Sequence, residues 1–262
     1  MDSSMKTSAS GMMAQQRMID VIANNLANVN TTAFKRSRVS FEDVLYETVQ
    51  GARITNPQTA ETVGPVQIGK GVRVGAVLRL DNPGAPETTQ RPLDVSIQGD
   101  GFFQVQRPDG VTGYTRDGGF TLSDAGSLVT KDGHGLLPEI TVPQDASAIS
   151  ISPNGVVTAT ITGSSTPTEI GRIELARFLN PNGLIAVGQN EFLETQASGT
   201  AVTGFPEDEG LGQLLQGSLE SSNVEIVQEM TDMIAAQRAY EINAKAIQAS
   251  DQMMQAAHDL IR

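Results

Sequence analysis

The side chains that most often carry chemistry are scarce in this sequence of 262 residues. It contains two histidines and no cysteine, so a disulfide framework and a thiolate metal site are both excluded. His134 lies in the turn-like stretch Asp132-Gly133-His134-Gly135, where we expect it to be exposed to solvent. His258 has no histidine, cysteine or acidic residue four positions later, so we expect a structural role for it.

Motifs for nucleophilic, dinucleotide or calcium chemistry are also missing. The sequence has no G-x-S-x-G motif, and Gly69-Lys70-Gly71 and Gly99-Asp100-Gly101 lack the third glycine of a dinucleotide-binding loop. The Asp-Gly pairs lack the distal glutamate of a calcium loop and are better explained as turns. We therefore assign no catalytic, cofactor-binding or metal-binding residue, and we predict that the protein is not an enzyme and uses no cofactor.

Charge and hydropathy exclude two further classes of protein. The net charge of −12 argues against a nucleic-acid partner, because phosphate binding needs clustered Lys and Arg. The sequence contains no run of 18 apolar residues, so no transmembrane helix is predicted. The first residues lack the basic and apolar regions of a secretory signal, so we expect export, if it occurs, to use another route.

The two ends of the chain share one helical pattern, in which mostly apolar residues recur at alternating steps of four and three. Such spacing keeps one stripe of a helix against a partner helix, and it predicts helices over residues 3–28 and 223–260. The N-terminal stripe consists of Met5, Ala9, Met12, Gln16, Ile19, Ala23 and Leu26. The C-terminal stripe consists of Ile226, Met230, Met233, Gln237, Tyr240, Ala244, Ile247, Asp251 and Met254.

These stripes favour self-assembly over catalysis. Isolated helices are marginal in water, and a lone molecule cannot fully bury two apolar stripes of this length. We therefore interpret the stripe residues as a surface that contacts further copies. A glutamine interrupts each stripe, and two explanations stay equally open: Gln16 and Gln237 hydrogen-bond inside a bundle and fix its register, or they face a channel or a water-filled gap.

Between the helices the sequence favours β structure. From Asp94 onward, apolar and polar residues alternate over short runs, and pairs such as Asp117-Gly118 and Asn154-Gly155 mark tight turns. The predicted fold is α+β, with long terminal helices that pair as a coiled-coil stem and a central antiparallel all-β domain. The predicted domains are 1–33 with 217–262 (helical assembly), 34–92 with 205–216 (extended connectors) and 93–204 (β domain).

Two local features complete this prediction. Ser222-Asn223-Val224-Glu225 matches a capping box at the start of the C-terminal helix. Lys35, Arg36 and Arg38 form a basic group within the first connector. We interpret this group as a solvated face rather than as a binding site for an acidic partner.

Two motifs carry a resemblance to a known family. Residues 22–35 read IANNLANVNTTAFK and residues 237–245 read QRAYEINAK. They resemble the paired terminal signatures of the flagellar axial proteins, which are rod, hook and hook-associated subunits; stretches 94–105, 114–118 and 214–220 are similar to the distal-rod branch. Many members have glycine at the position of Ala33. Because this chain has alanine instead, a positive φ is not predicted there. The N-terminal family motif maps to Asn24, Asn25, Leu26, Ala27, Asn28, Thr31 and Phe34.

The resemblance implies a structural subunit that is exported through the flagellar type III apparatus without a cleaved signal peptide. It implies helical polymerisation into a hollow, rigid rod of the flagellar basal body, which crosses the periplasm, surrounds an export channel and transmits torque from motor to hook. The implied partners are further copies, hook protein, proximal-rod subunits, and periplasmic and outer-membrane ring proteins. Residues 46–64 correspond to a stretch that hook subunits lack and that is thought to stiffen the rod.

Three alternatives remain at this point. A proximal-rod or hook-type subunit of the same family is the nearest. A peptidoglycan-cutting enzyme would need paired catalytic carboxylates, and no convincing pair is found. A secreted coiled-coil adhesin or translocator would form a closed soluble oligomer instead of an open tube.

Overall fold

The computed structural model describes residues 2–51, 53–56, 61–63, 65–162, 166–208 and 210–260. The chain forms two compact units. The helical unit combines the residues up to Ala27, the segment Ser37–Arg79 and the residues from Glu225 onward. The β unit combines Asn28–Arg36 with Leu80–Val224. The three domains expected from the sequence stay a prediction.

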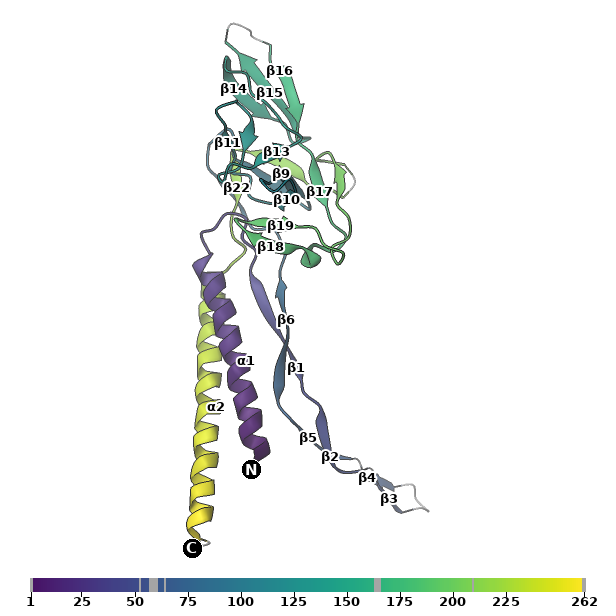
Figure 1. The fold of residues 1–262 in the computed structure, drawn as a ribbon, viewed down its shortest axis with the longest axis vertical. Helices are drawn as coiled ribbons and strands as arrows, with labels where there is room; N and C mark the ends of the chain where they lie inside the picture. Colours follow the sequence, from purple (N-terminus) through teal and green to yellow (C-terminus); the bar gives the residue numbers. More distant parts are fainter. Residues whose placement is uncertain are drawn as a thin grey trace. The chain divides into compact units, whose positions relative to one another are not determined.

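Two long helices dominate the helical unit. Helices α1 (Asp2–Ala27) and α2 (Ile226–Leu260) pack against each other in opposite directions (Figure 1). Asn25 donates to Glu229 Oε2 at 3.1 Å near one end of the pair. Further along, Gly11 lies so close to Asn243 that a Cβ atom would be 3.0 Å from the amide nitrogen. The predicted α+β class, with helices at both ends, is confirmed.

A two-stranded ribbon completes this unit and lies against α1. Its antiparallel pairs are β1 (Ser37–Asp43) with β6 (Val72–Arg79), β2 (Tyr46–Gln50) with β5 (Val66–Gly69), and β3 (Arg53–Asn56) with β4 (Glu61–Val63). Val72 N donates to Ser10 Oγ at 3.3 Å. Gly71 permits this approach, because its φ is +110° and a Cβ atom would be 2.2 Å from Ser10 Oγ. Much of the first expected connector is therefore paired backbone.

The β unit is built on antiparallel sheets. The largest has nine strands within the described chain, in the order β11-β12-β13-β9-β10-β19-β18, with β17 joined to both β9 and β20. These strands are β9 (Phe102–Gln106), β10 (Thr112–Thr115), β11 (Thr121–Leu122), β12 (Leu128–Val129), β13 (Gly135–Leu137), β17 (Leu175–Arg177), β18 (Ile185–Gly188), β19 (Glu191–Leu193) and β20 (Val202–Gly204). A 3₁₀ turn, η1 (Pro181–Gly183), precedes β18.

Smaller sheets extend this body. A three-stranded sheet contains β14 (Ala146–Ile151), β15 (Val156–Ile161) and β16 (Thr168–Arg172). The pairs β8 (Val95–Gln98) with β21 (Gln213–Gln216) and β7 (Pro86–Thr88) with β22 (Ser218–Glu220) join residues that are far apart in sequence. The second expected connector, 205–216, thus contributes a strand to the β unit.

The core of the β unit is formed by apolar residues of these strands and of the segments between them. Phe103 and Phe120 meet edge to face at 5.1 Å between ring centroids, a geometry that aromatic pairs favour. The fully buried members of this core include Val95, Phe103, Phe120, Leu128, Leu136, Ile140, Val157, Ile173, Leu175 and Leu214. The predicted turn at Asn154-Gly155 is confirmed, with a φ of +85° at Gly155.

The start of α2 differs from the sequence prediction. The helix begins at Ile226, so Ser222 and Glu225 do not form a capping box at its first turn. Ser222 Oγ instead accepts a hydrogen bond from Val224 N at 3.3 Å. Among the residues that the structure describes, no helix has the length and apolarity needed to cross a membrane.

Candidate functional site

The stripe that joins α1 to α2 is offset from the stripes predicted by spacing. The buried residues of the two helices are Ala14, Ile22 and Asn25 on α1, and Glu229, Ala236 and Ser250 on α2. Met5, Ala9, Met12, Ile19, Leu26, Met233, Ala244, Ile247 and Met254 are half-buried. Gln16, Ala23, Ile226, Met230, Gln237, Tyr240 and Asp251 are exposed. Within one molecule no residue of the predicted stripes is fully buried, and their role in self-assembly stays a prediction.

Asn25 of the family motif links three elements of the helical unit. Its Oδ1 accepts from Ser37 N at 2.9 Å, and its Nδ2 donates to Ser37 O at 2.8 Å and to Glu229 Oε2 at 3.1 Å. The side chain is 1 % exposed. Because a buried amide must satisfy both its donors and its acceptor, Asn25 holds the end of α1, the start of β1 and the first turn of α2 in one arrangement.

The later motif residues form a turn in the β unit. Thr31 Oγ1 donates to Asn28 Oδ1 at 3.1 Å, and Phe34 N donates to Thr31 O at 3.2 Å. Ala33 N then donates to Glu220 O at 2.8 Å. The φ of Ala33 is +57°, so the chain adopts a positive φ here although alanine replaces the glycine of many family members. The turn imposes the left-handed conformation that glycine tolerates best.

The next residue, Lys35, enters a buried ion cluster. Glu220 at the end of β22 accepts hydrogen bonds from Lys35 Nζ, from Arg116 Nε at 2.8 Å and from Gly84 N at 2.9 Å. Lys35 also donates to Asn82 O at 2.9 Å. The side chains of Lys35 and Glu220 are 3 % and 2 % exposed. The prediction that Lys35 belongs to a solvated face is therefore wrong, because Glu220 supplies a buried countercharge.

Arg116 extends the cluster to a tight loop. Its Nη1 donates to Gly101 O at 3.1 Å, and its Nη2 donates to Gly99 O at 2.9 Å and Ile97 O at 3.3 Å. A planar guanidinium is suited to several such bonds at once. Arg116 thus fixes the backbone between β8 and β9.

Asn223, three residues after Glu220, joins the segment that contains Lys35 to the segment at residues 80–82. Its Oδ1 accepts from Arg36 N at 2.7 Å, and its Nδ2 donates to Leu80 O at 2.8 Å and Asn82 O at 2.9 Å. The segment that follows α1 in sequence and the segment that precedes α2 are therefore bound to each other within the β unit. We name Lys35, Arg116, Glu220 and Asn223 the crossing cluster.

The electrostatics of the crossing cluster are dominated by two cations around one carboxylate. Burial by itself would raise the pKa of Glu220, but Arg116 and Lys35 outweigh burial and hold the pKa below its ordinary value of 4.5. The carboxylate is ionised at neutral pH and accepts three hydrogen bonds. This arrangement positions backbone rather than transferring protons, so it fits a structural role.

Sequence reasoning could not have found this cluster. Glu220 lies 185 residues from Lys35 and 104 residues from Arg116, and no local spacing marks three such distant residues as partners. Asn223 does belong to a recognisable motif, but that motif was interpreted as a helix cap.

A second buried pair corrects the prediction for His134. The imidazole Nδ1 hydrogen-bonds to Glu191 Oε1, and Glu191 Oε2 lies 3.7 Å from Arg107 Nε. His134 is 8 % exposed. Its ring is buried because Glu191, on β19, offers a polar partner inside the unit. His258 is exposed on α2.

Comparison with known proteins matches the chain in three successive segments. The family model "Flagella basal body rod protein" matches residues 5–35, "Flagellar hook protein FlgE/F/G D1 domain" matches residues 96–159, and "Flagellar basal body rod FlgEFG protein C-terminal" matches residues 215–260. These segments contain α1 with its motif, much of the β unit, and the crossing-cluster residues Glu220 and Asn223 with α2.

Several relatives match over almost their whole length, and each is named flagellar basal-body rod protein FlgG. The chain is 47% identical to the Caulobacter vibrioides protein over 257 residues, which covers 98% of both chains. It is 48% identical to the Borreliella burgdorferi protein over 260 residues, covering 98% of this chain and 97% of the relative. It is 39% identical to the Bacillus subtilis protein over 264 residues, covering 99% of each.

Replacement of the central carboxylate should destabilise the β unit strongly. Glu220→Gln leaves Lys35 and Arg116 buried without a countercharge, and we expect it to lower the free energy of unfolding by about 3–5 kcal/mol. Denaturant titration measures this change. Glu87→Gln alters an exposed acid on the paired strand β7 and should stay within about 0.5 kcal/mol of the wild type. Equal effects of the two variants would refute the assigned role.

The same carboxylate should make stability depend on acid pH. Because the pKa of Glu220 is lower in the folded chain than its ordinary value of 4.5, the contribution is fully present above pH 4.5 and is lost as the pH falls through the folded value. Wild-type protein should thus lose more stability than Glu220→Gln on acidification below pH 4.5. Parallel pH profiles of the two proteins would contradict this.

The left-handed residue gives a third test. Ala33→Val places a β-branched side chain at a φ of +57° and should lower the free energy of unfolding by about 1–3 kcal/mol. Ala33→Gly should be close to neutral, because relief of about 1 kcal/mol of strain offsets the lost burial of one methyl group. Thermal or denaturant unfolding of both variants measures the contrast, and a valine variant as stable as wild type would disprove it.

Proposed function

This chain belongs to the FlgG family of flagellar basal-body rod proteins, and we propose that its terminal helices polymerise it into a hollow helical rod. The resemblance carried by the terminal motifs is confirmed by near full-length matches. The protein is a structural subunit of the distal rod and a component of the flagellar basal body. The proposal concerns how copies assemble, what they contact and how the rod carries torque.

The observation that carries this proposal is the exposed apolar surface of α2. Val227, Met230, Ile234 and Ile242 are between 49% and 73% exposed, although all four are aliphatic or thioether side chains. Several large exposed apolar side chains on one helix of a soluble chain indicate an interaction site. Packing against α1 leaves these side chains open, so we propose that they are buried against helices of neighbouring copies. Met230 belongs both to this surface and to the predicted stripe, and we propose the other stripe residues as further contacts.

The ribbon supports the same interpretation. Leu45, Tyr46, Val49 and Ile68 are each more than half exposed, with Leu45 at 84%. A two-stranded ribbon is marginally stable alone in water, so these side chains favour burial in an assembly. We propose that the stretch 46–64 stiffens the rod in this way; residues 52, 57–60 and 64 lie outside the described residues.

A rod of this kind needs a contact that repeats without closing. Head-to-tail association of identical copies generates an open helical filament when the rotation does not close a ring. We propose a tube with the terminal helices inside, around an export channel, and the β unit outside. Its proposed partners are hook protein, proximal-rod subunits, the periplasmic and outer-membrane ring proteins, and the type III export apparatus; its proposed role is torque transmission without catalysis.

The proposed tube leaves two possible positions for Gln16 and Gln237. Gln16 and Gln237 are both exposed in the single subunit. Inside the proposed tube they either hydrogen-bond across copies and fix register or face the channel, and both alternatives stand.

A charge on the open face of α2 should block assembly without unfolding the subunit. Met230, which is 51% exposed, would be buried by neighbours, so Met230→Glu should raise the concentration needed for polymerisation at least about tenfold. Light scattering measures polymerisation, and electron microscopy identifies the expected straight hollow tubes. Met230→Leu keeps the apolar surface and should polymerise as wild type does. If Met230→Glu formed tubes at the same concentration as the wild type, the proposal that this face of α2 lies in the interface would be wrong.

A further inference from the structure

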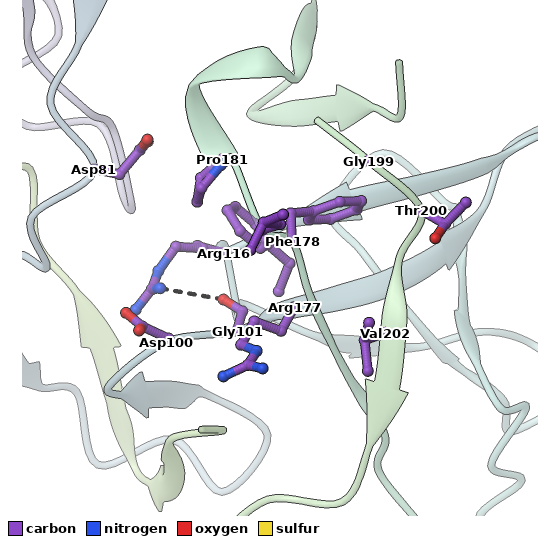
Figure 2. A pocket seen from close by; sticks show the side chains of 12 residues that line it. Asp81, Asp100, Gly101, Arg116, Arg177, Phe178, Pro181, Gly199, Thr200 and Val202 are labelled. Carbon is purple, nitrogen blue, oxygen red and sulfur yellow. Dashed lines mark hydrogen bonds between the residues drawn. The ribbon is translucent and has the colours of Figure 1, made fainter. Parts of the chain in front are cut away.

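A pocket of about 620 Å³ opens at one end of the β9–β10 hairpin, entirely within the β unit (Figure 2). Its lining includes Phe102 at the start of β9 and Phe178 after β17. The two rings meet edge to face at 5.8 Å between centroids, and both are buried. Arg116 forms part of another wall, where its guanidinium is held by Gly101 O at 3.1 Å. The pocket therefore has an aromatic lining on a rigid frame.

Two aliphatic side chains on the lining of this pocket are unusually exposed. Leu179 is 96% exposed and Val202 is 59% exposed, and both line the pocket. Single exposed leucines are common, but two such side chains beside a pocket with aromatic lining indicate a contact surface. The lining also carries the carboxylates Asp81 and Asp100 and the cations Arg116 and Arg177. Arg177, also on the lining, has no ion pair among the described residues; its Nη1 reaches Gly210 O at a long 3.5 Å.

The opposite end of the same hairpin carries a turn with an exposed aliphatic residue and an exposed acid. The turn joins β9 to β10 over residues 107–111. Val111 is 50% exposed. The side chain of Asp109 is also 50% exposed and makes a loose ion pair with Arg107 at 3.7 Å. The length of β9 separates this turn from the pocket by about 17 Å.

We propose that the pocket is a docking site for a second copy of this chain, which inserts its β9–β10 turn. Val111 of the incoming copy packs at the aromatic lining beside Leu179, and Asp109 pairs with Arg177. Donor and acceptor surfaces lie at opposite ends of one hairpin, so each copy offers one and receives the other. Such a contact is heterologous and repeats along a filament. The inference rests on the proposed self-assembly and adds a contact between β units to the contacts of the terminal helices.

The absence of cysteine from the chain makes a direct test available. Leu179→Cys and Val111→Cys are purified separately, checked for folding by circular dichroism, mixed, polymerised and oxidised. Docked copies place the two thiols at high effective concentration, so we expect the mixed disulfide in at least about fivefold excess over the control mixture. The control pairs Leu179→Cys with Leu122→Cys, because Leu122 is similarly exposed, at 44%, but belongs to strand β11 rather than to the β9–β10 turn.

The outcomes separate this inference from the proposed function. Polymers with the 179–111 disulfide in excess support both. Polymers with equal disulfide yields in the two mixtures, or with 179 joined mainly to another segment, overturn the docking of this turn and leave the rod function standing. A wild-type chain that forms no polymers under any tested condition overturns the rod proposal and this inference with it.

A charge exchange gives a second, independent readout. Arg177→Glu should raise the concentration needed for polymerisation about fivefold, because Asp109 of the next copy then meets a like charge. Adding Asp109→Arg to the same chain should restore at least half of the loss. A double variant no better than Arg177→Glu alone would exclude the pairing of residues 109 and 177. A small-molecule occupant of the pocket would show neither the disulfide nor the rescue.

Discussion

The arrangement of the β unit depends on the pairing of one buried carboxylate. Glu220 is almost inaccessible to water, and it is held by Lys35, Arg116 and the backbone of Gly84. An ion removed from water is tolerated only when charges and hydrogen bonds replace its hydration. Because those partners come from three distant segments, the chain satisfies Glu220 only when Lys35 after α1, Gly84 before β7 and Arg116 after β10 are all in place. The cluster thereby specifies one arrangement, whatever its net contribution to stability.

The helical unit is organised by a different constraint. Its two helices pair through small residues and a buried polar contact, with Ala14, Ala236 and the Asn25–Glu229 hydrogen bond along the seam. Small side chains allow the helices to approach closely, while Val227, Met230, Ile234 and Ile242 of α2 stay on outward faces. Those faces are unfavourable in an isolated molecule and favourable in a lattice of copies. The same surface that makes the subunit adhesive therefore provides the driving force for a filament.

The β unit and the helical unit thus have complementary physical roles. The β unit has a dense aromatic and aliphatic core and a buried ion cluster with paired charges, which are features of a fold that holds together by itself. The helical unit exposes apolar residues on α2 and on the ribbon, which are features of a surface that awaits partners. A shaft requires both properties, because rigid blocks must be joined through extended and repeated contacts.

Local patterns in the sequence determined the helices, the turns and the family. The four-three spacing marked α1 and α2, Asn154-Gly155 marked a hairpin, and the asparagine motif identified the axial proteins, because each of these depends on neighbours within a few residues. The tertiary structure decided which helix face pairs within the subunit, as well as the burial of Lys35 and His134 and the positive φ of Ala33. Those properties depend on partners such as Glu220 and Glu191, far along the chain. Spacing shows that a face is apolar, and only three-dimensional packing selects the surface that covers it.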